Sequence, residues 1–140
     1  MKKMKLTALA AAASIGFSAV AQAGFVQPFP VDVDLTNNIA SGDQVSARGD
    51  KDNDVFIGCG SRTISTGGGT FRTGFCQAED AAGERVICMT QDPDLLDEMR
   101  ANSSYSFITF SFQPDGAGGF TCTRVGFSTQ SFYLEKVKPN

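Results

Sequence analysis

The strongest pattern of apolar and polar positions lies near the carboxyl end of the chain, at residues 103–134. Aromatic, β-branched and small polar residues alternate over residues 105–112 without a helical period, which is typical of a β-strand. Pro114, Asp115 and Gly116 then favour a reversal, because proline presets φ, aspartate binds nearby amides and glycine permits positive φ. Large side chains occupy both faces of residues 105–112. The pattern therefore predicts a long hairpin whose first strand is central in a sandwich or closed barrel.

Shorter strand patterns fill most of the chain before this hairpin. Turn residues separate them, and the three consecutive glycines of residues 67–69 are predicted as one turn. Residues 41–54 are polar and are predicted as a loop that contains one short strand. The expected strands, including a last one at the end of the chain, are residues 31–35, 44–47, 55–57, 61–66, 70–77, 84–90 and 131–137.

One segment, residues 92–102, carries the signals of an α-helix. Asp92 is a suitable N-cap and Pro93 suits the first helical position. Three apolar residues recur on one helical face, namely Leu95, Leu96 and Met99. The segment is predicted as a helix of two to three turns that covers one end of the sheet.

Strands outnumber helices, so the sequence predicts a mainly β fold. We expect a small antiparallel sandwich or barrel-like domain with one short helix, stapled by two disulfides. The expected organisation is a signal peptide at residues 1–23, an extended or loop-like segment at residues 24–52 and a disulfide-bonded β domain at residues 53–140. The part that follows the signal peptide is long enough for one domain with its own core.

Residues 1–23 have the three parts of a secretory signal peptide. Lys2, Lys3 and Lys5 form a positive start, a small apolar stretch follows, and residues 21–23 read Ala-Gln-Ala, as a cleavage site does. The lysine-rich start is typical of bacterial export signals, so a periplasmic or secreted location is expected. The apolar stretch is too short for a stable transmembrane helix, and no membrane span is expected after cleavage.

Charge narrows the range of partners. The chain has 12 basic and 15 acidic residues, and loss of the three signal-peptide lysines leaves a net charge of −6. Nucleic acids are bound by clustered Lys and Arg, whereas the arginines of this chain are scattered. The sequence therefore predicts no nucleic-acid partner and leaves an unknown protein or envelope ligand.

Cys59, Cys76, Cys88 and Cys122 make an even set in an exported chain, which predicts two disulfides. Three pairings are possible. If the strands that carry Cys76 and Cys88 form a hairpin, the two residues lie opposite each other, where a bond can form at a non-hydrogen-bonded position. We therefore favour Cys76–Cys88 with Cys59–Cys122, and the other two pairings stay open. The chain has no C-x-x-C pair, so a zinc site is not expected.

The chain has no histidine, which removes the commonest general base and the serine and cysteine triads that depend on it. It also lacks nucleotide-binding and phosphate-binding motifs. Glu79, Asp80 and Glu84 come nearest to a carboxylate pair for glycoside hydrolysis, but they fall in a predicted turn, where solvated side chains are expected. The sequence predicts no catalytic residue, no cofactor and no enzymatic activity.

Asp50, Asp52 and Asp54 alternate as the oxygen ligands do at the start of a calcium-binding loop. Later positions of such a loop need a glycine and a glutamate, where the chain has Val55 and Ser61. The three aspartates are a weak calcium candidate, and a solvated polar loop is the favoured interpretation.

These observations favour a non-catalytic binding or inhibitor module of the cell envelope, acting through loops on a rigid sheet. The alternative is a structural or self-assembling envelope component that uses the uncharged, β-prone strand at residues 106–112. The loops expected to carry contacts are residues 58–60, 67–69, 92–102 and 114–119.

Overall fold

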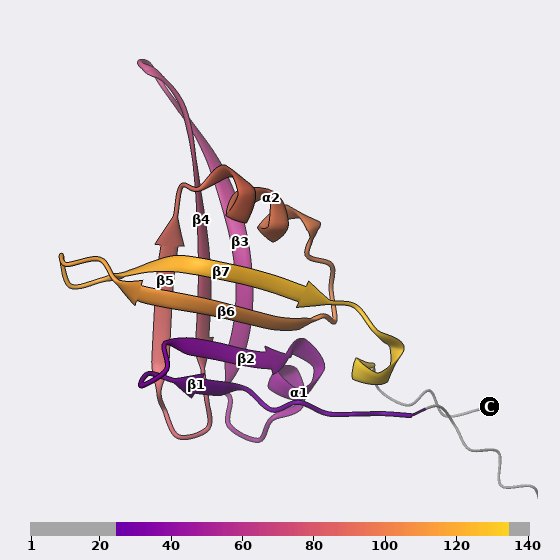
Figure 1. The fold of residues 1–140 in the computed structure, drawn as a ribbon. Helices are drawn as coiled ribbons and strands as arrows, with labels where there is room; N and C mark the ends of the chain where they lie inside the picture. The colour runs from indigo at the N-terminus through magenta and orange to yellow at the C-terminus, as the bar shows by residue number, and fades with distance from the viewer. Residues whose placement is uncertain (1–24, 135–140) are drawn as a thin grey trace, which may run out of the picture.

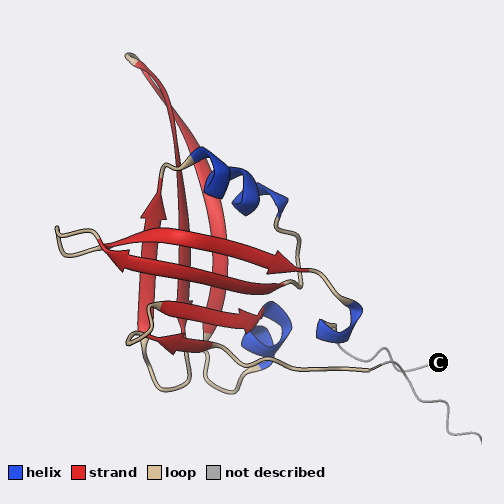
Figure 2. Ribbon diagram, in the orientation of Figure 1, coloured by secondary structure: helices blue, strands red, loops and turns tan. Residues whose placement is uncertain are grey.

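The computed structural model describes residues 25–134. The predicted signal peptide at residues 1–23 lies outside this range. The fold consists of strands with short helices, shown in Figures 1 and 2. Its elements, in chain order, are β1 (Asp32–Asp34), β2 (Ile39–Asp43), α1 (Gln44–Gly49), β3 (Phe56–Thr66), β4 (Gly69–Glu79), β5 (Arg85–Thr90), α2 (Pro93–Ala101), β6 (Phe107–Pro114), β7 (Phe120–Ser128) and a 3-10 helix (Ser131–Tyr133).

Seven strands form one mixed sheet in the order β1-β2-β6-β7-β5-β4-β3. Neighbouring strands are antiparallel except β5 and β7, which run parallel and meet at one pair, Met89 and Thr121. The sheet folds over at this junction, so β3, β4 and β5 form one layer and the other four strands run crosswise in a second (Figure 1). β1 and β3 are the two edges, and the sheet is not closed into a barrel. The predicted mainly β fold is confirmed.

The core lies between the two layers, because alternate residues of each strand point inward. Ile108, Phe110 and Phe112 of β6 are buried and share one apolar cluster with residues of β4 and β5 such as Cys76 and Val86. β6 lies between β2 and β7, so the prediction of a central strand is confirmed. The large side chains of this strand are therefore used inside the domain.

The turn between β6 and β7 forms as its sequence predicts. Asp115 Oδ1 accepts hydrogen bonds from the amides of Ala117 and Gly119 at 2.7 and 2.9 Å. These bonds, chiefly the one from Ala117, lower the pKa of Asp115 below its usual value because they stabilise the charged carboxylate. Gly116 and Gly118 have positive φ values of 78° and 95°, a conformation that glycine adopts readily.

The predicted helix is also present, as α2. Asp92 Oδ1 accepts hydrogen bonds from the amides of Asp94 and Leu95, so it caps the helix as expected. Leu96 and Met99 are buried over Gly74 of β4, where a Cβ atom would collide with both side chains. α2 has nine residues, and no helix between residues 25 and 134 has the length and hydropathy of a membrane span.

The amino-terminal part differs from its prediction. Residues 44–47, predicted as a strand within a loop, begin helix α1 instead. Asp43 caps this helix, since its Oδ1 accepts a hydrogen bond from the Ser46 amide at 2.7 Å. β2 pairs with β6, and Val33 and Ala40 are buried in the common core, so residues 25–52 contribute strands to the same sheet.

The end of the chain differs as well. The last strand, predicted at residues 131–137, is replaced over Ser131–Tyr133 by a 3-10 helix, and residues 135–137 lie outside the described range. The Gln27 amide donates a hydrogen bond to the Phe132 carbonyl, and the rings of Phe107 and Tyr133 stack. Aromatic packing against the sheet thus takes the place of strand pairing here.

The four cysteines form two disulfides, but the favoured pairing is wrong: the bonds join Cys59 to Cys76 and Cys88 to Cys122. Cys76 does lie opposite Cys88, as expected, but it also lies opposite Cys59. The Cα atoms of Cys59 and Cys76 are 4.0 Å apart, the close spacing of a non-hydrogen-bonded pair. The ladder alternates, so Cys76 and Cys88 form the wider, hydrogen-bonded kind of pair. Cys88 is left to bond Cys122, which ties the two layers together.

Candidate binding surface

The four loops expected to carry contacts do not meet at one place. Residues 58–60 lie inside β3 and are not a loop. Residues 67–69 hold the tip of the β3–β4 hairpin, residues 92–102 hold α2, and residues 114–119 turn the chain between β6 and β7. Figure 1 shows the hairpin tip and the β6–β7 turn at separate corners of the molecule. A binding surface must therefore be sought from the geometry itself.

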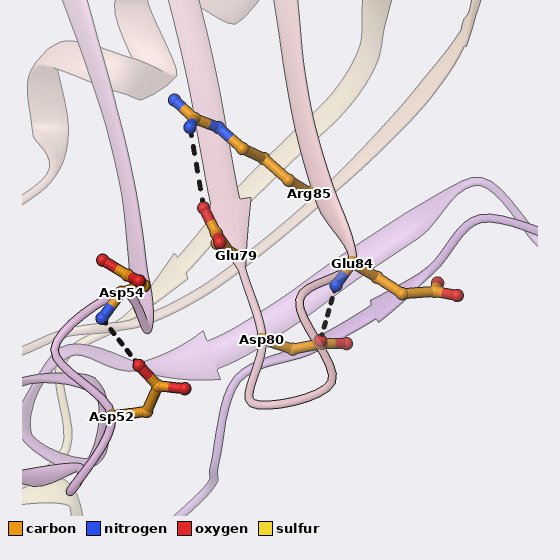
Figure 3. Close-up of polar contacts among 6 residues, drawn as sticks. All are labelled: Asp52, Asp54, Glu79, Asp80, Glu84 and Arg85. Atoms are coloured by element: carbon orange, nitrogen blue, oxygen red, sulfur yellow. Dashed lines mark hydrogen bonds and ion pairs between the residues drawn. The ribbon is translucent and has the colours of Figure 1, made fainter.

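The acidic residues of the β4–β5 turn are held by structural contacts (Figure 3). Asp80 Oδ1 accepts hydrogen bonds from the amides of Ala82 and Glu84 at 2.9 and 3.0 Å. Glu79 lies 3.6 Å from Arg85, and the Glu84 side chain points away from the other two carboxylates. The three do not converge as the two carboxyl groups of a glycosidase do. The geometry therefore favours ordinary turn residues.

The weak calcium candidate is not assembled into a site. Asp50 and Asp52 each accept a hydrogen bond from the amide two residues later, that of Asp52 at 2.9 Å and that of Asp54 at 3.0 Å. In such turns the carboxylate binds its own backbone. Within residues 25–134, no three acidic or cysteine side chains lie close enough to hold a metal ion. This loop therefore supports no metal proposal.

The far half of the β3–β4 hairpin departs most from an ordinary sandwich. β3 and β4 have eleven residues each, whereas β5 has six. Along β4, the pairing with β5 covers residues 74–79 and stops there. Residues 61–73, which we call the arm, therefore extend beyond the third strand of their layer (Figures 1 and 2). Every residue from Ser61 to Arg72 is exposed. The arm thus has solvent on both faces.

The arm combines apolar and cationic side chains. Ile64 and Phe71 are cross-strand partners and are 38% and 46% exposed. Arg62 and Arg72 are the charged residues of the arm, in a chain whose net charge is negative. The Arg62 guanidinium lies 5.2 Å from the ring centroid of Phe75, a cation–π contact. Arginine and aromatic side chains are the types that protein interfaces favour.

The apolar surface of the arm continues along the outer face of the β3–β5 layer. Phe75 and Met89 lie opposite each other, and Ile87 follows on the same face of β5. Ile87 and Met89 are 49% and 46% exposed. We call this set the outer strip: Ile64, Phe71, Phe75, Ile87 and Met89. A row of large apolar side chains along one face is a typical mark of an interaction surface.

The two edges of the sheet are treated differently. β1 has three residues, and the Val33 amide donates a hydrogen bond to Asp80 Oδ2 at 3.2 Å. The first and last residues of β1 are carboxylates, Asp32 and Asp34. The hydrogen bond from the Asn37 side chain lowers the pKa of Asp34, because it stabilises the charged form. Short length and inserted charge are devices that block edge pairing. β3, with eleven residues, has neither a carboxylate nor a proline along its edge.

A groove lies where the sheet fails to close, between the start of β3 and α1. It has a volume of about 510 Å³ and is lined by residues 55–57 on one side and by Arg48 and Tyr105 on the other. Tyr105 is 55% exposed and has a φ of 66°. A positive φ is uncommon for tyrosine, and such strained positions cluster at functional sites. The groove extends the open edge of β3 and adds a second cation to it.

The sequence predicts the strands and the turn of the arm but not its projection. The available signal was the length of the predicted strands. A hairpin turned at residues 79–83 brings residues 84–90 back only as far as residue 74, which leaves residues 70–73 without a partner on that side. Tyr105 carries no comparable signal, because tyrosine has no preference for positive φ that a sequence could reveal.

The described surface offers an open strand edge, an outer strip of apolar side chains and two arginines, Arg48 and Arg62, beside that edge. Groups of this kind hold another chain by backbone hydrogen bonds, apolar contact and charge. Known proteins supply no further guide, since no family model, no curated protein and no solved structure matches this chain.

Proposed function

We propose that the protein is a non-catalytic binding module, exported to the periplasm or the exterior, whose contact surface is the arm with the outer strip. The observation that carries the proposal is the run of twelve consecutive exposed residues from Ser61 to Arg72. A two-stranded ribbon is marginally stable by itself in water and gains stability from a third strand or a packed face. A partner that covers the arm supplies both.

The side chains of the arm support the same proposal. Ile64 and Phe71 leave more than a third of their surface in water, at a cost of about 25 cal/mol for each Å² of apolar area left unburied. An isolated exposed apolar residue is common on protein surfaces, but a row of them along one face of a sheet is not. Binding of a protein partner removes this area from water, and Arg62, on the same face as Ile64 and Phe71, adds directional contacts.

The disulfides support the exported location. Cys59–Cys76 and Cys88–Cys122 are compatible with an oxidising compartment, where such bonds persist. The sequence of residues 1–23 predicts the export signal that would deliver the chain there.

The proposal is tested by site-directed photo-crosslinking in an exporting bacterium that produces the full chain. Benzoylphenylalanine replaces Phe71 in the arm, and a matched protein carries it at Leu35, which is 42% exposed in the turn after β1, the opposite edge strand of the sheet. We expect a discrete adduct with another protein from position 71 and none from position 35. Equal labelling at both positions, or no adduct at position 71, would contradict the proposal.

The alternative, a self-assembling component built on residues 106–112, loses the observation that suggested it. Ile108 and Phe110 are fully buried, and Phe112 is 2% exposed. Self-assembly would now have to use the arm. An adduct at position 71 with the mass of two copies of this chain would favour that alternative over a binding module.

A further inference from the structure

We infer that the open edge of β3 takes up an extended, acid-bearing strand of a partner protein, which adds to the sheet beside β3 and runs from the arm into the groove beside α1. The inference rests on the proposed function and names the chemistry of the partner. Three independent features carry it: the backbone groups of β3, the distribution of charge, and the space available on the outer face.

The backbone of β3 presents hydrogen-bonding groups to solvent in a regular row. Cys59 belongs to a closely spaced, non-hydrogen-bonded pair with Cys76, so its amide and carbonyl point away from β4. The strand repeats every two residues, so the backbone groups of Ser61, Thr63 and Ser65 point the same way. Among residues 25–134, β3 has β4 as its single neighbour in the sheet, and the turn and loop hydrogen bonds of this range do not involve these residues. An added strand would satisfy the whole row.

The charges along this edge select the partner. Arg62 projects from β3 and Arg48 lines the groove at its lower end. Among residues 25–134, the ion pairs within 4 Å join Arg85 to Glu79 and Arg100 to Asp97, so neither Arg48 nor Arg62 is engaged with a carboxylate. A strand with acidic side chains therefore meets two cations along its path. These pairs give orientation and specificity more than bulk affinity.

The same charges disfavour a second copy of this chain as the occupant. In an antiparallel pairing of two β3 strands about Ser61, the two Arg62 side chains would be diagonal neighbours, about 7–8 Å apart. Like charges directly opposite each other are destabilising, and two like charges at this diagonal distance still repel each other. Arg62 thus disfavours pairing of two β3 strands and favours the addition of an acidic strand.

The outer face leaves room for apolar side chains of the partner. No atom of the described part of the chain lies within 4 Å of the position that a Cβ atom at Gly58 would occupy, whereas Gly60 is covered by the ring of Phe75. Gly58 and Arg62 share this face, four residues apart in the strand. A fitting partner strand therefore places a bulky apolar residue over Gly58 and an acidic residue at Arg62, on the same face of its own strand.

The probe is the acetylated and amidated nonapeptide TVTTTETTT, which has valine and glutamate four residues apart on one face, compared with TVTTTKTTT. Binding to the mature disulfide-bonded protein is measured by NMR, with hydrogen exchange of the Ser61 and Thr63 amides as the site readout. We expect the acidic peptide to bind at least tenfold more tightly and to slow exchange of both amides at least fivefold. Equal affinity for the two peptides, or binding without protection of these amides, overturns the inference.

Two variants and a pair of modified peptides sharpen the test. Arg62→Glu should reverse the preference between the peptides, whereas Arg124→Glu, an exposed arginine on β7, should leave it unchanged. Methylation of alternate peptide nitrogens blocks one edge of the added strand, so one of the two alternating patterns should abolish binding and the other retain it. Binding of both methylated peptides, or a reversed preference between the acidic and basic peptides in Arg124→Glu, overturns strand addition.

The outcomes also separate this inference from the proposed function. A partner protein crosslinked through position 71, together with unprotected β3 amides, would keep the binding module and remove strand addition. A β3–β3 dimer, detected by light scattering of the mature protein and abolished by Ser61→Pro, would show that a second copy occupies the edge and would overturn the inference. Protection of the β3 amides by the acidic peptide, with the protein monomeric, supports it.

Discussion

Replacement of both Cys88 and Cys122 by alanine removes the covalent link between β5 and β7, and the size of the effect follows from the structure. The two residues are separated by 34 positions. A cross-link that closes a loop of this length restricts the unfolded chain by about 12.6 cal/mol/K, or about 3.8 kcal/mol at 25 °C, in the chain-entropy account. Cys88 and Cys122 are also buried, at 0% and 2% exposure, so loss of the sulfur atoms adds to the destabilisation.

The matched control is the double variant that removes Cys59 and Cys76, which are separated by 17 positions. The same reasoning gives about 3.1 kcal/mol for this shorter loop. Both losses are large against a total stability of about 5–15 kcal/mol for a domain of this size. Removal of the β5–β7 bond should therefore be the more damaging of the two, whereas removal of the Cys59–Cys76 bond leaves β3 attached to β4 by strand pairing alone.

Urea unfolding followed by circular dichroism suits this protein, since it has no tryptophan to report by fluorescence. We expect the midpoint to fall in both variants, and further when the Cys88–Cys122 bond is absent. Digestion with trypsin under non-reducing conditions tests the pairing directly, because cleavage after Lys51, Arg62, Arg72, Arg85, Arg100 and Arg124 places each cysteine in a different peptide. Residues 52–62 should be linked to residues 73–85, and residues 86–100 to residues 101–124. A link between residues 73–85 and 86–100, or a loss below about 1 kcal/mol in the Cys88/Cys122 variant, would refute the reasoning.

Three further predictions concern stability. Phe110→Ala should cost about 3–5 kcal/mol in urea unfolding, because Phe110 is fully buried, whereas Phe71→Ala in the arm should cost about 1 kcal/mol or less; equal losses would contradict the assignment of core and arm. Asp43→Ala should lower the unfolding free energy by about 2–3 kcal/mol and speed amide exchange in α1, since the buried carboxyl group binds the amides of Phe29 and Ser46; unchanged exchange would argue against the cap. The pKa of Asp115 is lower in the folded than in the unfolded state, so the charged carboxylate contributes to folding stability above the unfolded pKa, and this contribution is lost as pH falls through the folded pKa. The wild type should therefore have a higher Tm than Asp115→Asn at pH 6, and the difference should vanish near pH 2. A difference in Tm that does not change with pH would contradict this account.

The elements that local chemistry determines could be predicted from the sequence. The β6–β7 hairpin follows from Asp115 and its glycines, and α2 follows from the cap at Asp92 with the apolar face over Gly74. Helix α1 is different, because it has six residues with one of them buried, Ala47, and so shows no helical period. Its cap at Asp43 was the one local signal.

The features that decide the candidate surface depend on pairing between distant residues. The favoured disulfide pairing has the correct register for Cys76 and Cys88, which lie opposite each other. It fails because the sequence does not show whether that pair is the closely spaced or the widely spaced kind, which the β3–β4 ladder determines. The openness of the β3 edge depends likewise on strand order, since β3 would be covered if the sheet closed onto β1. Alternation along a strand predicts which face is buried but does not predict which strand stands at the edge.

The position of Cys76 between Cys59 and Cys88 bears on the order in which the two disulfides form. Cys76 and Cys88 are closer in sequence than either bonded pair, and the shorter loop closes with less loss of entropy. We expect a Cys76–Cys88 bond formed early on the β4–β5 hairpin to be resolved when the Cys59 thiolate attacks the Cys76 sulfur and displaces the Cys88 thiolate. A second disulfide donor, itself reduced to a dithiol, then oxidises Cys88 and Cys122 to the remaining bond. A disulfide isomerase should therefore speed maturation, and acid quenching of refolding should trap the Cys76–Cys88 species; oxidation that proceeds without this species would exclude the route.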